Sequence, residues 1–426
     1  MRGGKEALNF LRSGRVQEIA DTVLETSFLG FLLLLFFSSQ AANFALILLG
    51  LSWIIRRLSA PSFFPKTPLG KPLLFFFISL SLSALFSETR SHSLQQLASE
   101  APKILVIFFG SLEYLRGQDR FRRLFWASAW VIFVIGADGL LQLVLGQDLI
   151  RGAALLRGRV RAHFPSPTFF EYSLPLFSFP LLLLEQGGKW WKRAFIGLAA
   201  LAFALSAAFS GTRSVWIALA LILILVALSS RRKVLYLCFL GILILAVAVL
   251  PIAKSRHRLS SPRDLVSEQK YQRMLAWQIS YRLFLSRPIL GRGLDFFVKY
   301  KRNAELQRPY LSPSVYERVK ASGKGAVFPV YHPHSIYLEV LASQGVIGMA
   351  AFLSVLIALF HSLWRKRRGP PLLFWGTWAA LLSFLICGAV GTSFYHLWSY
   401  GIFWLLAGMG LALKGENGIG SRGISV

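Results

Sequence analysis

The chain alternates long apolar stretches with short polar segments. A helix needs about 20 apolar residues to cross the roughly 30 Å hydrocarbon core of a bilayer. Twelve stretches approach that length, at about 23–39, 42–56, 72–87, 101–115, 122–146, 168–185, 194–210, 214–229, 234–252, 335–361, 371–389 and 395–413. Because they are continuously apolar and lack the alternation of barrel strands, each is predicted to be a membrane-spanning helix.

Composition favours the same class of protein. Of 426 residues 55% are hydrophobic, and the mean hydropathy is +0.55, as in integral membrane proteins. We expect an all-α, polytopic fold in three parts. Nine spanning helices occupy 1–252, a large and mostly helical outer loop occupies 253–334, and three further spans with the C-terminus occupy 335–426. Cys238 and Cys387 both fall inside predicted spans, so no disulfide framework is expected.

Basic residues in the short loops predict the orientation, since Lys and Arg mark the cytoplasmic side of a membrane protein. With the N-terminus inside, every predicted inner loop is basic. These loops carry Arg56, Arg57, Lys66 and Lys71; Arg116, Arg120, Arg122 and Arg123; Lys189, Lys192 and Arg193; Arg231, Arg232 and Lys233; and Arg365, Lys366, Arg367 and Arg368. Both termini are therefore predicted to be cytoplasmic, and the long loop to lie outside.

The long outer loop is strongly basic as well. Residues 253–333 hold 16 Lys and Arg but five Asp and Glu, a formal charge of +11. Long loops cross the membrane regardless of charge, so a solvated basic domain is one explanation. The other is a surface that holds an anionic ligand. Within the loop, 261–286 is expected to form an amphipathic helix, and 291–293 a glycine turn whose amides approach a phosphate.

Further arginines reach the same side. The loop 147–167 contributes Arg159 and Arg161, and the turn 210–213 ends with Arg213 at the outer end of a helix. A guanidinium binds phosphate oxygens bidentately and stays charged near a low-dielectric surface. The sequence has no nucleic-acid-binding motif and no Asp-x-Asp pair for Mg²⁺. The predicted partner is a lipid-linked phosphate or pyrophosphate, bound without a metal or other cofactor and without nucleic acid.

Three segments carry a family pattern. They are RVRAHFPSPT at 159–168, SGTRSVW at 210–216 and FPVYHPHSIYLEVLASQGVIG at 328–348. In the third segment a histidine precedes a glycine by eleven residues, which matches His334 and Gly345. Together with the large outer loop, these segments resemble the O-antigen ligase and polymerase superfamily of membrane glycosyltransferases.

The resemblance implies a GT-C-like architecture and a reaction in the bacterial inner membrane. A glycan would pass from an undecaprenyl-pyrophosphate carrier to a hydroxyl of the lipid A–core oligosaccharide at the periplasmic face. His334 would be the catalytic base or would orient the acceptor, since a neutral imidazole accepts a proton near neutrality. Arg213 and Arg273 would bind the pyrophosphate, assisted by Arg159 or Arg161. Secondary candidates are His332, His163, Arg287 and Arg292.

Two other functions remain open. An O-antigen polymerase would use the same donor but extend another lipid-linked glycan. A lipid-glycan flippase or transporter would need charges near the bilayer midplane and related halves, whereas the ionisable residues cluster at one face. We also expect Pro333 to aim the two flanking imidazoles differently, Gly345 and Gly348 to let neighbouring helices approach, and Asp138 to be paired inside the bundle.

Overall fold

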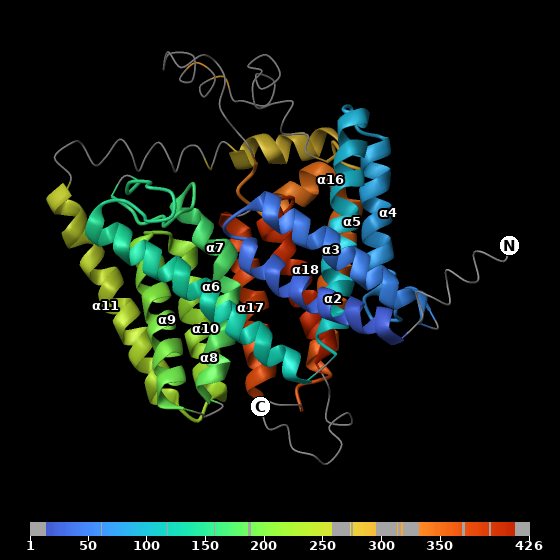
Figure 1. The fold of residues 1–426 in the computed structure, drawn as a ribbon. Helices are drawn as coiled ribbons and strands as arrows, with labels where there is room; N and C mark the ends of the chain where they lie inside the picture. The colour runs from blue at the N-terminus through green and yellow to red at the C-terminus, as the bar shows by residue number, and fades with distance from the viewer. Residues whose placement is uncertain are drawn as a thin grey trace.

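Helices make up nearly all the regular structure of the chain. The computed structural model describes residues 14–60, 62–116, 118–156, 158–185, 189–257, 273, 276–294, 313, 317, 332–368, 371–391 and 393–413 (Figure 1). The helices are α2 (Gly14–Leu34), α3 (Ser39–Leu58), α4 (Gly70–Leu85), α5 (Arg90–Tyr114), α6 (Gln118–Leu145), η1 (Pro167–Phe169), α7 (Phe170–Ser173), η2 (Leu174–Phe177), α8 (Ser178–Glu185), α9 (Trp190–Phe209), α10 (Arg213–Ser229), α11 (Lys233–His257), α16 (Ile336–Trp364), α17 (Pro371–Val390) and α18 (Leu397–Ala412). Residues 276–286 are also helical.

The predicted all-α, polytopic class is confirmed. All twelve apolar stretches fall on helices. Within the described part of the chain, six helical segments are long and apolar enough to cross a membrane: Ser39–Leu58, Asp119–Leu145, Pro167–Glu185, Trp190–Phe209, Ile336–Trp364 and Pro371–Val390. Four shorter apolar helices are Gly70–Leu85, Arg213–Ser229, Lys233–Ala248 and Leu397–Ala412. Helices α2 and α5 belong to neither group, because polar residues occupy their first turns, so the number of twelve spans stays a prediction.

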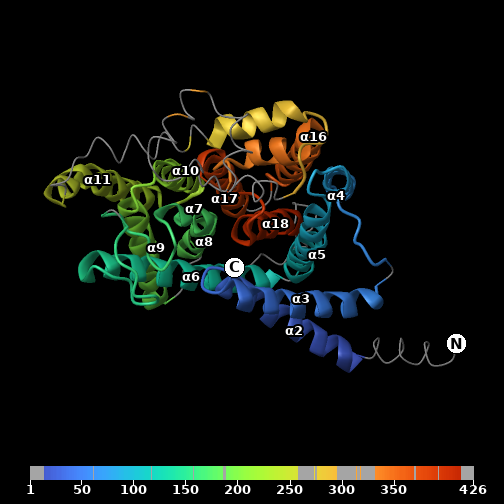
Figure 2. The same cartoon turned by 90° about the horizontal axis from the view of Figure 1, so that it is seen from above.

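The helices form two neighbouring groups. Helices α6, α8, α9, α10 and α11 lie on one side of the bundle, and α4, α5, α16 and α18 lie on the other (Figure 1). Helix α17 lies between the groups and packs against α10, α16 and α18. The α2–α3 hairpin runs along one edge of both groups, as Figure 2 shows. In the second group the buried Trp404 ring lies 5.8 Å from Phe76 and 6.0 Å from Phe108.

The predicted span 168–185 is a chain of short helical pieces rather than one regular helix. Here η1, α7, η2 and α8 follow each other directly, and Pro175 lies in the 3-10 turn between the two α pieces. Proline has no N–H for the helical ladder, so it favours this change of pitch. Nearly all side chains of the segment are buried. The break thus holds α7, including Glu171, inside the bundle.

Helix α16 is broken near its start, which corrects our expectation for Gly345. That residue has φ 66° and ψ −161°, outside the helical region, so it interrupts the helix instead of serving close helix packing. At Gly348 a Cβ would first meet the Gln344 side chain of the same helix, and its role in helix packing stays a prediction. The break separates a short first half, 336–344, from the long remainder of the helix.

The segment 288–293 fills this break with backbone hydrogen bonds. Arg292 N and Gly293 N donate to Ala342 O (3.0 Å) and Ser343 O (2.9 Å), and Val346 N and Ile347 N donate to Pro288 O (2.8 Å) and Ile289 O (3.3 Å). A Cβ on Gly345 would lie 2.3 Å from Ile289 O, and one on Gly291 would lie 2.3 Å from the Ser343 carbonyl carbon. Glycine is therefore required on both sides, and the first half of α16 is fastened to the outer segment.

Candidate functional site

Several loops and helix starts meet at one end of the bundle. The loop 146–166, the segment 276–294, the start of α10 and the start of α16 all lie at the upper end in Figure 1. We call this end the loop face. The family-like motifs noted in the sequence all reach it, although they are far apart along the chain.

His334 stands at the loop face, two residues before α16, in a strained backbone conformation. Its φ is 51°, in the left-handed region that non-glycine residues rarely occupy. The His334 N–H donates to His332 Nδ1 at 3.2 Å, and the two ring centroids are 4.1 Å apart. We expected Pro333 to aim the two imidazoles differently; the turn brings the two rings close together, with their planes 55° apart.

The His334 ring has an unused acceptor. Its Nδ1 is buried and has no hydrogen-bond partner, and the Gly391 backbone interacts with the same ring, with a smaller effect on its pKa than burial has. Burial, with a smaller effect of the Arg273 charge, lowers the pKa of His334 to about 4. Burial and then the neighbouring His334 lower the pKa of His332 to about 3. Both rings are therefore neutral near pH 7, and His334 Nδ1 can accept a hydrogen bond.

Arg213 and Arg273 are two cations that a ligand could bind at this face. Arg213 begins α10 with an exposed side chain, and Arg273 is partly buried. Among the described residues, neither guanidinium makes a hydrogen bond or an ion pair closer than 4 Å. The Arg273 charge nonetheless acts on both His332 and His334 and on the Glu171 carboxylate. The structure thus brings Arg273 and His334, predicted from separate motifs, into one electrostatic neighbourhood.

A comparison with protein families matches this part of the chain. Residues 198–353 fit the family model described as O-antigen ligase. We call these residues the O-antigen ligase domain, after the family that they match. The domain contains Arg213, Arg273 and His334, and members of this family are membrane glycosyltransferase-like enzymes. A search of curated proteins found no match to the chain.

Arg159 and Arg161 lie before the O-antigen ligase domain and bind the backbone. Arg159 donates through Nε to Ser210 O at 2.5 Å and through a terminal nitrogen to Thr212 Oγ1 at 2.9 Å. Arg161 donates to Ala154 O at 3.0 Å and to Pro165 O at 3.3 Å. Arg159 therefore stabilises the turn 210–212 that precedes Arg213. Arg161 joins two parts of the loop 146–166 in which it lies.

His163 is paired inside the bundle. Its Nδ1 lies 3.1 Å from Asp138 Oδ2 and its Nε2 lies 3.2 Å from Phe36 O. Asp138 Oδ1 also accepts from the Leu149 N–H at 2.9 Å, so the prediction that Asp138 is paired is confirmed. Both nitrogens of His163 are occupied, and we interpret this residue as a structural anchor of the loop 146–166.

Arg287 and Arg292 form a separate cluster with an acid. Arg292 bonds Glu88, and Arg287 lies 3.4 Å from the same carboxylate and donates to Phe86 O at 3.0 Å. The amides of Arg292 and Gly293, which we expected near a phosphate, are bonded to α16 instead. This cluster fastens the outer segment to the α4–α5 end.

The loop between α17 and α18 supports the start of α16, a role that sequence reasoning missed. Glu339 accepts hydrogen bonds from Ser393 Oγ at 2.8 Å and from the Phe394 N–H. Tyr395 Oη lies 3.0 Å from Ser343 Oγ and bonds the Gln344 amide. Gly391 approaches Glu171 so closely that no Cβ would fit. A Gly-Thr-Ser sequence after a span was the only signal for this loop.

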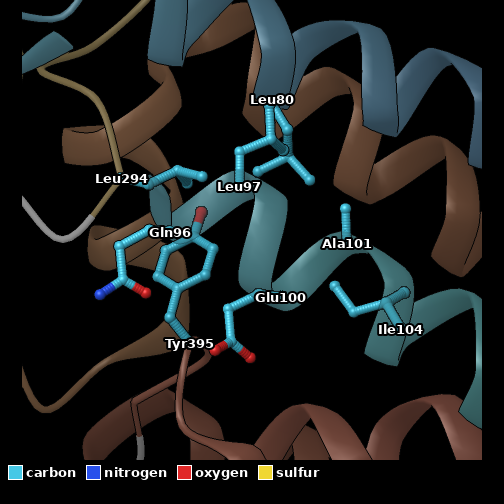
Figure 3. A pocket seen from close by; sticks show the side chains of 8 residues that line it. All are labelled: Leu80, Gln96, Leu97, Glu100, Ala101, Ile104, Leu294 and Tyr395. Carbon is cyan, nitrogen blue, oxygen red and sulfur yellow. The ribbon is translucent and has the colours of Figure 1, made fainter. Parts of the chain in front are cut away.

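Tyr395 also lines a small cavity beside the α16 break. The other lining residues are Leu80, Gln96, Leu97, Glu100, Ala101, Ile104 and Leu294 (Figure 3). The Glu100 carboxylate at its edge accepts from Tyr400 Oη and from Lys103 Nζ. Mostly apolar walls suit a hydrocarbon group and not a phosphate, so the arginines of the loop face remain the anion site. Among the described residues, no three His, Cys, Asp or Glu side chains are grouped to hold a metal.

Proposed function

We propose that this protein transfers a glycan from an undecaprenyl-pyrophosphate donor to a hydroxyl of the lipid A–core oligosaccharide. Arg213 and Arg273 would bind the pyrophosphate, and His334 would receive the acceptor hydroxyl. We further propose that the loop face is periplasmic, that both termini are cytoplasmic and that the membrane is the bacterial inner membrane. The basic inner loops support this orientation.

The observation that carries the proposal is the pairing of unused groups at one face. Within the O-antigen ligase domain, an acceptor nitrogen without a partner lies near Arg273, which no acid within the described residues neutralises by direct contact. Buried polar groups are normally satisfied, so an imidazole nitrogen without a partner beside a cation is unusual for a purely structural site. An anionic donor and a hydroxyl acceptor would satisfy both.

His334 and the two arginines act at different points of the proposed reaction. The acceptor hydroxyl donates to His334 Nδ1, and its oxygen attacks the anomeric carbon of the donor sugar. The bond from that carbon to the pyrophosphate oxygen breaks, and the leaving pyrophosphate takes the electron pair while Arg213 and Arg273 stabilise its charge. The hydroxyl proton moves toward His334 as the new bond forms. Because the pKa of His334 is low, the imidazole is a weak base. It therefore contributes more to catalysis by orienting the acceptor hydroxyl than by removing its proton.

Reconstitution tests the reaction directly. Purified full-length protein in liposomes, supplied with lipid-linked glycan and lipid A–core, should produce glycan-bearing lipid A–core. The product should form at the same rate with EDTA present, since we propose that arginines replace a metal. Absence of any transfer to lipid A–core would contradict the function, and loss of transfer in EDTA would contradict metal independence.

A deletion strain separates the ligase from the polymerase. Loss of a ligase leaves long polymer on the undecaprenyl carrier and unmodified core. Loss of a polymerase leaves core carrying a single repeat unit. We expect the first pattern, and the second would assign the polymerase reaction to the same site.

A further inference from the structure

Glu171 is a buried carboxylate with an unused oxygen, and the reaction proposed above does not employ it. The side chain is 1% exposed. Its Oε1 accepts a hydrogen bond from Ser214 Oγ, while Oε2 is buried and has no partner. Burying a charged group without full hydrogen bonding is costly, so its place beneath a candidate site calls for an explanation.

The carboxylate is connected to three arginines of the loop face, to Arg273 and Arg159 through their charges and to Arg213 through the adjacent Ser214. Ser214 follows Arg213 directly, so the Glu171–Ser214 bond fixes the first turn that presents Arg213. Burial has the largest effect on the Glu171 carboxylate, and the charges of Arg273 and Arg159 have smaller effects on it. Arg159 in turn braces the turn before Arg213. Glu171 thus interacts with Arg273 and Arg159 by charge and with the start of α10 through Ser214.

Gly391 connects this carboxylate to His334. A Cβ on Gly391 would lie 1.8 Å from Glu171 Oε2, so the carboxylate occupies the space that any other residue would need. The backbone of the same glycine bonds the His334 imidazole. The acid and the histidine therefore lie on two sides of one residue.

When Glu171 is ionised, its negative charge in this position competes with an anionic ligand. It attracts the same guanidiniums that would hold a pyrophosphate, and it repels the pyrophosphate itself. In a site with low dielectric, such interactions are much stronger than in water. Strong binding of a product slows its release, which limits turnover in many enzymes.

We propose that Glu171 is a positioning residue, an internal counter-anion that seats the loop-face arginines and weakens their hold on the leaving pyrophosphate. This inference rests on the proposed function. Glu171 touches neither donor nor acceptor and acts through Arg213 and Arg273. Its role is to keep the cations in place between turnovers and to let the lipid pyrophosphate depart.

The isosteric variant Glu171→Gln tests the charge while it preserves the shape beside Gly391. Inorganic pyrophosphate, a soluble analogue of the leaving group, is the probe, and its binding to full-length protein in detergent is measured by titration. Glu171→Gln should bind pyrophosphate about tenfold more tightly than the wild type. In the transfer assay its kcat and its KM for the donor should both fall, whereas loss of fold would lower kcat alone.

Glu185→Gln is the matched control. Glu185 ends the same segment at the opposite end of α8, where its carboxylate accepts from Ser230 Oγ and Tyr236 Oη. Its neutral variant should bind pyrophosphate as the wild type does. Glu171→Asp, which retains the charge, should restore affinity to within about twofold of the wild type.

Ser214→Ala provides a second test that does not depend on the folding of Glu171→Gln. It removes the hydrogen bond and frees the full carboxylate for the arginines, so pyrophosphate affinity should fall severalfold. Unchanged or weaker binding by folded Glu171→Gln, or tighter binding by Ser214→Ala, would overturn the inference. Wild-type protein that transfers glycan without binding pyrophosphate would overturn it too, while the proposed function would stand. Wild-type protein that neither binds pyrophosphate nor transfers glycan would overturn both.

Discussion

Arginines at the two ends of the bundle differ in their partners. At the end opposite the loop face, Arg57 is 7% exposed and lies 3.5 Å from Glu113, and Arg56 and Arg116 reach the same carboxylate at 3.3 and 3.0 Å. At the loop face, Arg213 and Arg273 make no such contact with the described residues. A buried cation that is paired stabilises a fold, whereas a cation held near a site without a close partner is available to a ligand.

The largest effect should come from removing a buried arginine of the Glu113 ion pairs. Arg57→Ala leaves Glu113 partly uncompensated in the interior and removes the hydrogen bond to Phe63 O at 2.8 Å. We expect the free energy of unfolding to fall by about 3–5 kcal/mol, measured by denaturation in detergent. The specific activity of the folded fraction should stay close to that of the wild type.

Arg116→Ala is the control for this change, because Arg116 contacts the same acid from a half-exposed position. Its loss should cost less than about 1 kcal/mol. Equal stability of the two variants would show that burial does not distinguish these pairs.

The unpaired arginines should show the reverse behaviour. Arg213→Ala and Arg273→Ala should each lower the rate of glycan transfer by about 10²–10³-fold, or about 3–4 kcal/mol, with little change in stability. The rate is measured with purified protein in liposomes. Arg282→Ala, an exposed cation on the same outer segment, should transfer glycan at the wild-type rate. A similar loss in all three variants would indicate general charge attraction rather than a defined site.

Gly345→Ala should loosen the loop face without touching an arginine. A β-carbon would collide with Ile289 O at a backbone angle that L-residues avoid, and we expect a loss of about 3 kcal/mol in thermal denaturation. Gly197→Ala in α9, where a Cβ meets nothing within 4 Å, should be neutral or slightly stabilising. Stability of Gly345→Ala equal to that of Gly197→Ala would contradict the interlocked break in α16.

A pH titration should give the smallest effect. The folded-state pKa values of His334, about 4, and His332, about 3, lie below the ordinary value near 6.5, so the unfolded chain binds more protons as the pH falls. Stability should therefore decrease from about pH 6.5 downward, by on the order of 2 kcal/mol at pH 5 for His334.

The histidine variants separate this contribution from the rest of the chain. His334→Asn should flatten the fall in melting temperature between pH 7 and pH 5, while His361→Asn at the exposed far end of α16 should leave it unchanged. A fall of the same size in His334→Asn and in the wild type would mean that His334 is not buried as a neutral group.

The sequence predicted the helices and the motifs well, for a physical reason. Apolar stretches of about 20 residues must form helices in a bilayer, so hydropathy alone located the two helices next to whose starts Arg213 and His334 lie. The exact ends were harder, since the first turns of α5 are polar and are held by tertiary contacts such as that of Ser93 Oγ with Leu294 O at 3.1 Å.

The different roles of the arginines could not be predicted from the sequence. Arg159 and Arg213 look equivalent as residues beside a span, and only the folded chain shows that one binds backbone oxygens and the other does not. The break at Gly345 could not be predicted either. At the break, backbone hydrogen bonds join residues about fifty positions apart, and local helix propensity gives no information on such contacts.

Transfer by the His334→Ala variant tests the central claim most directly. In liposomes holding lipid-linked glycan and lipid A–core, we predict that this variant transfers glycan at least about 100-fold more slowly than the wild type. Its fold and its binding of pyrophosphate should be retained, and His361→Ala should match the wild type. Transfer by folded His334→Ala at the wild-type rate would contradict a site built on His334.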